Sequence, residues 1–205
     1  HVRTETSNGY EFEAEQVMYN SGARLLKSPQ SVKMMGPKSP DGDRLLLTGK
    51  DLVADLNTNE MLVKENVRAQ RKIKGDRNLL ITSQSAEFSG RSNYARFLGE
   101  VVIHVDSTQI TGPSAQFNYK PSSDVLDSVD VLGGVKVTDV DKFATANQVS
   151  VQLEDDRFIF RGSPRVVQNG DELSGEEIVF HEGGKRVQVR KASPGVPPIT
   201  PRTEL

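Results

Sequence analysis

Apolar and polar residues alternate along this chain in six stretches that share one pattern. The stretches begin at intervals of 35, 34, 29, 34 and 29 residues, at Phe12, Leu47, Ile81, Ile110, Ala144 and Leu173. Two residues after each start the side chain is small, at Ala14, Gly49, Ser83, Gly112, Ala146 and Gly175. The residue four places after each start is polar, and the residues five and seven places after it are apolar. A recurrence of this length predicts a repeat architecture.

Each repeat is interpreted as a β-hairpin. Alternation of apolar and polar residues is the period of a strand, and turn residues and a second apolar run follow each stretch, as at residues 101–103 and 135–137. Asn8-Gly9 and Asn169-Gly170 are dipeptides suited to a type I′ hairpin turn. Because such connections are too short for a parallel crossover, we expect antiparallel pairing throughout.

The small residue in each repeat is expected to mark a bend. Ile110 and Ala115 are five positions apart, so a regular strand would place these two apolar residues on opposite faces. A bulge or bend at Gly112 would let both face inward, and a residue without bulk suits such a bend. A bend repeated in every hairpin would curve the whole sheet in one direction.

Composition favours an elongated sheet over a compact ball. Hydrophobic residues make up 35% of the chain, which is low for a compact two-layer core, and charged residues make up 26%. The charges lie within the strands, as in the run Glu-Phe-Glu-Ala-Glu at residues 11–15. One face of most strands is therefore expected to be wet, in an open or folded-over sheet.

The charged residues indicate no nucleic-acid partner. The formal net charge is −2, so no global field attracts a polyanion. The cationic cluster Arg71, Lys72, Lys74 and Arg77 surrounds a Gly-Asp turn, and we interpret it as a solvated hairpin tip.

No pattern of catalytic or metal-binding residues stands out. The chain has no cysteine, which excludes disulfides, thiolate metal sites and cysteine nucleophiles. Its three histidines lack metal-ligand spacing, so we expect neither a metal site nor a cofactor. Glu154, Asp155 and Asp156 are compatible with paired carboxylates for glycoside hydrolysis, but a hairpin tip explains them better. We expect no enzymatic activity.

Aromatic residues are concentrated in the last four repeats, where they share a face with Val and Ile. They form either an ordinary filled core or an apolar groove for an acyl chain, which a sheet that bends without closing would leave accessible. The larger candidate groove residues are Phe88, Phe117, Tyr119, Val151, Phe158, Phe160 and Phe180, with Ala115, Val149 and Ile178 as smaller wall residues.

Residues 160–180 closely resemble the OstA/LptA-type domain of lipopolysaccharide transport. That family shows a Gly and a Val, then Gln-x-Gly-Asp, then Leu-x-Gly-x-x-Ile-x-Phe or Tyr, as from Gln168 to Phe180. The earlier chain resembles the LptC periplasmic domain at residues 9–14, 97–103, 110–117 and 132–137. The resemblance covers about residues 9–191, or an LptC-like part at 9–105 that continues into an LptA-like part at 106–191.

The resemblance implies an all-β fold, namely an elongated, folded-over antiparallel β-jellyroll of about six hairpins. It also implies a periplasmic bridge component that shields the lipid A acyl chains of lipopolysaccharide between an inner-membrane ABC transporter and the outer membrane. Other Lpt β-jellyroll proteins and the transporter are the implied protein partners. LptC members carry an N-terminal transmembrane helix, so the resemblance implies a periplasmic protein anchored to the inner membrane by such a helix, which is not part of this sequence.

Both ends of such a sheet are expected to offer edge strands to these partners. The candidates are the strand with Tyr10 and Phe12 and the strand with Val187 and Val189. The Pro-rich residues 192–205 are expected to be an extended, disordered tail.

Two other function classes compete with lipid transport. One is a structural or adhesive β-repeat protein with a filled core, and the other is a carbohydrate-active β-sandwich enzyme. A groove along the long axis favours transport, a closed core favours the structural protein, and two facing carboxylates favour the enzyme.

Overall fold

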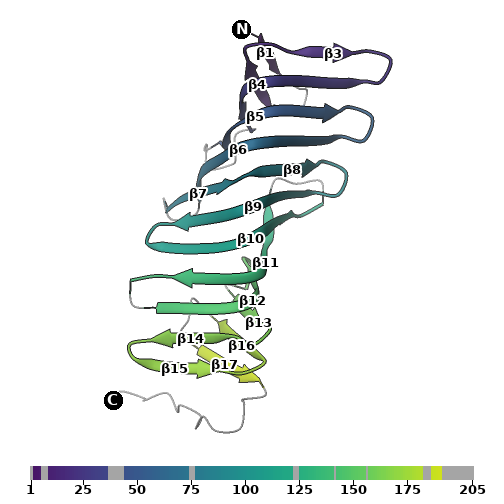
Figure 1. The fold of residues 1–205 in the computed structure, drawn as a ribbon. Helices are drawn as coiled ribbons and strands as arrows, with labels where there is room; N and C mark the ends of the chain where they lie inside the picture. The colour runs from purple at the N-terminus through teal and green to yellow at the C-terminus, as the bar shows by residue number, and fades with distance from the viewer. Residues whose placement is uncertain are drawn as a thin grey trace.

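The computed structural model describes residues 2–5, 9–36, 44–73, 77–121, 125–140, 142–155, 157–181 and 186–190. In these residues the chain forms one antiparallel sheet of 17 strands (Figure 1), and they include no helix long and apolar enough to cross a membrane. The strands are β1 (Val2–Glu5), β2 (Glu11–Ala14), β3 (Met18–Asn20), β4 (Leu25–Met35), β5 (Leu46–Asp55), β6 (Glu60–Ile73), β7 (Arg77–Ser83), β8 (Ser85–Ser89), β9 (Tyr94–Val105), β10 (Thr108–Tyr119), β11 (Leu126–Thr138), β12 (Lys142–Gln152), β13 (Arg157–Arg161), β14 (Arg165–Gln168), β15 (Asp171–Ser174), β16 (Glu177–His181) and β17 (Arg186–Arg190).

The sheet folds over along its length, as the pairing of long and short strands shows. The first half of β6 pairs with β8 and its second half pairs with β7, and β9 pairs with the same two short strands. β12 is divided in the same way between β13 and β14. One layer, which we call layer A, therefore holds β1, β2, β7, β14 and β15. The other, layer B, holds β3, β8, β13, β16 and β17, and each long strand contributes one half to each layer.

The bends lie where the small residues predicted them. Pairing shifts register between Thr48 and Lys50, and again between Gly112 and Ser114. A Cβ added to Gly49 would lie 2.4 Å from Cγ1 of Val63, and a Cβ on Gly112 would lie 2.8 Å from Cγ1 of Val131. The chain approaches itself so closely at these bends that no larger side chain fits.

Returning strands bend by a second device, a pair of residues with positive φ. Gly99 and Glu100 in β9 have φ angles of 76° and 47°, and Gly133 and Gly134 in β11 have 91° and 94°. Glycine adopts this conformation at little cost, which explains three of the four residues. The bend in Ile110–Ala115 is confirmed, since both side chains are buried on the same side of the folded sheet.

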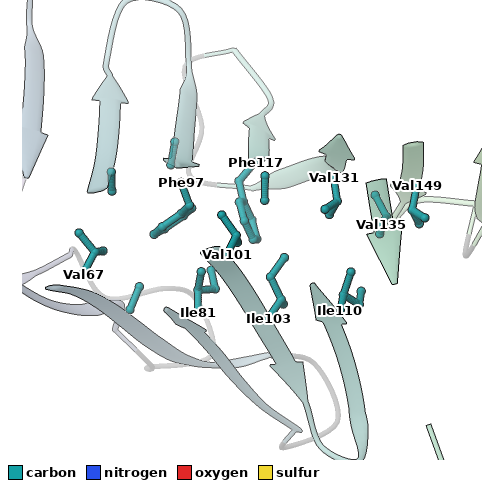
Figure 2. Close-up of a cluster of buried hydrophobic side chains, with 14 of the residues drawn as sticks. Val67, Ile81, Phe97, Val101, Ile103, Ile110, Phe117, Val131, Val135 and Val149 are labelled. Carbon is teal, nitrogen blue, oxygen red and sulfur yellow. The ribbon is translucent and has the colours of Figure 1, made fainter. Parts of the chain in front are cut away.

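The core lies between the two layers. Buried apolar residues from nearly every strand form one continuous cluster. In Figure 2, Phe97 and Phe117 come from layer B, Val67, Ile81 and Ile103 come from layer A, and all five point into the same interior. The elongated, folded-over antiparallel jellyroll expected from the sequence is therefore confirmed.

Four strands form the ends of the stack, and one predicted end is wrong. Within the described ranges, β1 and β3 pair on one side only at the N-terminal end, as do β15 and β17 at the C-terminal end. Phe12 lies in β2, which is covered by β1 on one side and β4 on the other, and Tyr10 precedes it. The Asn8-Gly9 turn signal is compatible with a strand before it, and among the described residues that strand, β1, lies outside β2. Asn8 and the predicted tail at residues 192–205 lie outside the described residues.

Candidate functional site

The apolar interior is built from parallel rows of side chains that run the length of the stack. In layer B the row nearest the bends, here called the bend row, contains Ser28, Leu52, Val63, Ala86, Phe97, Ala115, Val131, Val149, Phe160 and Ile178. All ten are buried. The row is continuous because successive strands pair antiparallel and every second residue faces inward.

A second row lies two residues farther from the bends, toward the hairpin turns, and we call it the rim row. It contains Leu26, Ala54, Met61, Phe88, Ala95, Phe117, Val129, Val151, Phe158, Phe180 and Val187. Ala95 and Phe117 are buried and Val187 is exposed, while the other members are half-buried. Partly exposed apolar surface therefore extends along the side of the interior that faces away from the bends.

The structure places all ten predicted groove residues on the inward face of layer B, but at two depths. Those with almost no exposed surface are Ala115, Phe117, Val149, Phe160 and Ile178. Those that are half-buried are Phe88, Tyr119, Val151, Phe158 and Phe180, all of which pack against the core. Only the second group presents surface to a ligand without a separation of the layers.

Edge-to-face aromatic contacts organise the interior at two places. The ring of Phe97 lies 6.1 Å from that of Phe88 and 5.4 Å from that of Phe117, with interplanar angles of 80° and 75°. Phe160 and Phe180 form a third such pair at 5.6 Å. This geometry suits the quadrupoles of the rings, so these side chains fill the interior in defined positions.

Sequence reasoning missed the layer A side of the interior. Leu79, Val105 and Val137 are half-buried there and pack against the core, and Phe97 was also left out of the predicted site. The sequence contained the signal, because each of these residues lies two positions from a buried residue of the same strand and so shares its face. The pairs are Leu79 with Ile81, Val105 with Ile103 and Val137 with Val135. The second apolar run of each hairpin carries the same inward face as the first.

The outward face of layer B is polar and hydrogen-bonded across the strands from β9 to β12, whereas in β13 and β16 it carries the buried apolar residues Ile159 and Val179. Arg96 donates through Nε and Nη2 to Oε1 of Gln116, at 3.0 and 2.7 Å. Gln116 in turn donates to Asn118, which donates to Oδ2 of Asp130 at 3.0 Å. Ser150 also donates to Asp130. These bonds join outward polar groups of β9 to β12, so in these strands the two faces of the layer have opposite chemistry.

The carboxylates at the β12–β13 turn pair with cations instead of facing each other. Oε2 of Glu154 lies 3.0 Å from Nζ of Lys120, and Oδ2 of Asp155 lies 3.8 Å from Nη2 of Arg157. The hydrogen bond from Lys120 to Glu154 raises the pKa of the lysine. Asp156 lies outside the described residues, which contain no group of three or more His, Cys, Asp or Glu that could hold a metal ion.

The sequence of the strands that form much of this interior matches a known family. Residues 80–185 fit the family described as the LptA/(LptD N-terminal domain) LPS transport protein, a span that exceeds half of the 205 residues. The chain belongs to this family. It is a family of transport proteins, and the match runs from within β7 to beyond β16.

Comparison with solved structures finds the crystal structure of LptH, the LptA homologous periplasmic component of the conserved lipopolysaccharide transport device from Pseudomonas aeruginosa. Sequence identity is 22%, the TM-score is 0.49, and the similarity covers 60% of this chain and 90% of that chain. No curated protein matches the chain significantly.

The strands before the family match extend the same fold. β6 pairs with both β7 and β8, so the hairpins of β1–β6 continue the stack of the LPS transport domain without a break. The predicted division between residues 105 and 106 falls between β9 and β10, which pair with each other. That division stays a prediction.

Proposed function

We propose that this protein carries lipopolysaccharide as one segment of a periplasmic bridge and shields the lipid A acyl chains between its two layers. Membership of the LPS transport family supports the transported substrate. The description of LptH as a periplasmic component agrees with a periplasmic location. An inner-membrane ABC transporter and further Lpt jellyrolls are the partners that this role requires.

The rim row is the observation that carries the proposal. It offers half-buried apolar side chains in hairpin after hairpin, from Leu26 in β4 to Phe180 in β16. Single exposed apolar residues are ordinary on protein surfaces, but an aligned series marks an interaction site. In the middle of the series, the outward neighbours Gln116 and Asn118 hydrogen-bond to each other, so in β10 only the inward face is apolar.

Apolar burial alone supplies enough free energy for this task. Each methylene group removed from water contributes about 0.8 kcal/mol, so a long acyl chain needs no polar contact. The sugars of the same molecule would stay in water outside the rim. The interior can therefore hold lipids of different chain length without dedicated polar residues.

Native mass spectrometry of the purified protein tests the proposal. We expect lipopolysaccharide to co-purify, and we expect Phe88→Asn to reduce the bound fraction because the substitution places an amide in the rim row. Glu87→Asn is the matched control, since Glu87 precedes Phe88 on β8 and faces outward. A protein that carries no lipid, or equal loss in both variants, contradicts the proposal.

A structural protein with a filled core is the second candidate, and the bend row favours it. Ten buried side chains and three edge-to-face aromatic pairs already pack against each other. This candidate predicts that no lipid co-purifies and that the rim row tolerates polar substitution. The measurement above therefore separates the two functions.

The C-terminal edge is proposed to dock the next jellyroll. β17 pairs with β16 on one side only in the part of the chain that the structure describes. The carbonyl of Arg190 accepts the N–H of Glu176 at 3.3 Å on that side, so by alternation the N–H of Val189 points toward the free side. Val187 also belongs to this edge, and its side chain is 44% exposed.

A proline at this edge tests docking separately from lipid binding. Val189→Pro removes one outward N–H, and we expect weaker capture of a partner jellyroll with lipid binding retained. Circular dichroism is the folding control. Unchanged capture by a folded variant would exclude this edge as the docking surface.

A further inference from the structure

One cation lies on the inward face of layer A at the edge of the apolar interior. Along the second half of β6, exposure alternates strictly, with Val67 and Ala69 buried and Arg68 exposed. Arg71 continues the inward series, two residues beyond Ala69, and is half-buried. The side chain therefore starts on the same face as the core.

The neighbours of Arg71 across the sheet are apolar. Leu79 pairs directly with it, and Val105 pairs with Leu79 on the next strand. On its other side, Leu45 directly precedes Leu46, which pairs with Gln70. Leu45, Leu79 and Val105 all pack against the core. Arg71 is thus a charged residue beside the apolar Leu79 and Val105, in a row that continues to Thr108 on β10.

One nitrogen of the Arg71 guanidinium has no partner in the part of the chain that the structure describes. This nitrogen, Nε, is also shielded from solvent. A shielded donor left unpaired is costly, and nearly all such groups in native proteins have a partner. Arg44, another half-buried arginine, shows the usual situation. It donates to Glu11 and to the carbonyl of Gly36, both at 2.6 Å.

We propose that Arg71 binds a phosphate group of an amphiphile whose acyl chains occupy the interior, an inference that rests on the proposed function. Guanidinium groups bind phosphate through two parallel N–H···O bonds. The Leu79 and Val105 side chains would contact the first methylenes of the same ligand. Arg71 would thereby hold the phosphate end of the lipid beside Leu79 in layer A and would select anionic over neutral lipids.

Two amphiphiles that differ only by a phosphate test this assignment in the full chain. We would titrate 1-oleoyl lysophosphatidic acid and 1-oleoylglycerol at low ionic strength, where charge interactions are least screened. Because a hydrogen bond to a charged group is comparatively strong, we expect the phosphorylated lipid to bind about tenfold more tightly. Arg71→Leu should reduce this preference to less than about twofold, by loss of the same charged bond.

Arg68→Leu is the matched control, since Arg68 lies on the outward face of the same strand, and it should keep the full preference. Retention of the preference in Arg71→Leu, or its absence in the unmodified chain, would overturn the assignment. Failure of both lipids to bind would instead contradict the proposed function. Competition by inorganic phosphate as strong as that of the phosphorylated lipid would show a free-anion site and would overturn the lipid-headgroup assignment.

The ligand-free protein gives an independent readout. Arg71→Leu removes an unpaired shielded donor and leaves an apolar side chain beside Leu79, so we expect its melting temperature to rise while that of Arg68→Leu stays unchanged. A fall for Arg71→Leu would show that the arginine already has a structural partner and would contradict the proposal.

Discussion

The bend row and the rim row of layer B have the same alternation and similar side chains, yet they differ in burial. Ile178 and Phe180 illustrate the contrast, because they lie two residues apart on β16 and both face inward. Ile178 has no exposed surface, whereas Phe180 is half-buried. Distance from the bend accounts for the difference in this pair, since the two layers meet at the bends and the hairpin turns lie at the opposite edge. The bend row is buried throughout, whereas most of the rim row keeps exposed apolar surface, with Ala95 and Phe117 as the buried exceptions.

Truncation of Ile178 and Phe180 to alanine should show the difference in stability between the two rows most clearly. Ile178→Ala leaves a cavity in a fully buried site, and we expect a loss of about 3 kcal/mol in the free energy of unfolding. Phe180→Ala removes a larger side chain from a half-buried site, and we expect a loss of only about 1.5 kcal/mol. Urea titration measures both.

Lipid binding should follow the opposite order for this pair. Phe180→Ala is expected to weaken lipopolysaccharide binding more than Ile178→Ala does, when both are measured under conditions in which each variant is folded. Equal effects of the two variants on stability and on binding would show that the rows are not distinct.

The next largest loss of stability is expected from a bulkier residue at a bend. Gly112→Ala places a Cβ 2.8 Å from Cγ1 of Val131. Such overpacking costs about 2 kcal/mol in the free energy of unfolding. Gly170→Ala is the control for added bulk, because nothing lies within 4 Å of its added Cβ, although its φ of 87° brings some strain of its own. Thermal unfolding of the two variants measures the difference, and equal losses would show that close packing at the bend is unimportant.

The sequence reveals the bends and the inward face but not the depth of each side chain. The five-residue spacing of Ile110 and Ala115 predicted a bend, and the close contact of Gly112 explains it. Alternation is identical in both rows, so it carries no information on distance from the bend.

Arg71 was interpreted as part of a solvated hairpin tip, because it is followed in sequence by other cations. The alternation of Val67 and Ala69 with Arg68 would have placed it on the inward face. The N-terminal edge was misassigned for a related reason, since β1 is short and fully exposed and has no apolar pattern of its own.

A smaller effect is expected from Ser28, the polar exception in the bend row. Its Oγ is buried and has no hydrogen-bond partner within the described part of the chain, while its row neighbours are apolar. Ser28→Ala removes the unpaired hydroxyl and should raise the free energy of unfolding by about 1 kcal/mol. Chemical denaturation measures the gain, and a loss of stability would show that the hydroxyl has a partner such as an ordered water.

The smallest effect is expected at the N-terminal end at acid pH. Hydrogen bonds from Arg44 and then Arg3 hold the pKa of Glu11 below its ordinary value. The stabilisation from this cluster is therefore present above the ordinary carboxyl pKa and is lost as pH falls through the lowered value. We expect the protection factors of the β1 amides, which correct for the intrinsic exchange rate at each pH, to fall at low pH before those of the core do. In Glu11→Gln this acid-dependent step should disappear, and its persistence would assign it to another carboxylate.

Site-specific photo-crosslinking tests the central claim most directly. A photoreactive residue at Phe158, in the rim row of β13, should capture lipopolysaccharide, and the same residue at outward-facing Gln116 should not. Crosslinks from Gln116 with none from Phe158 would contradict the account, because the acyl chains would then lie outside the two layers.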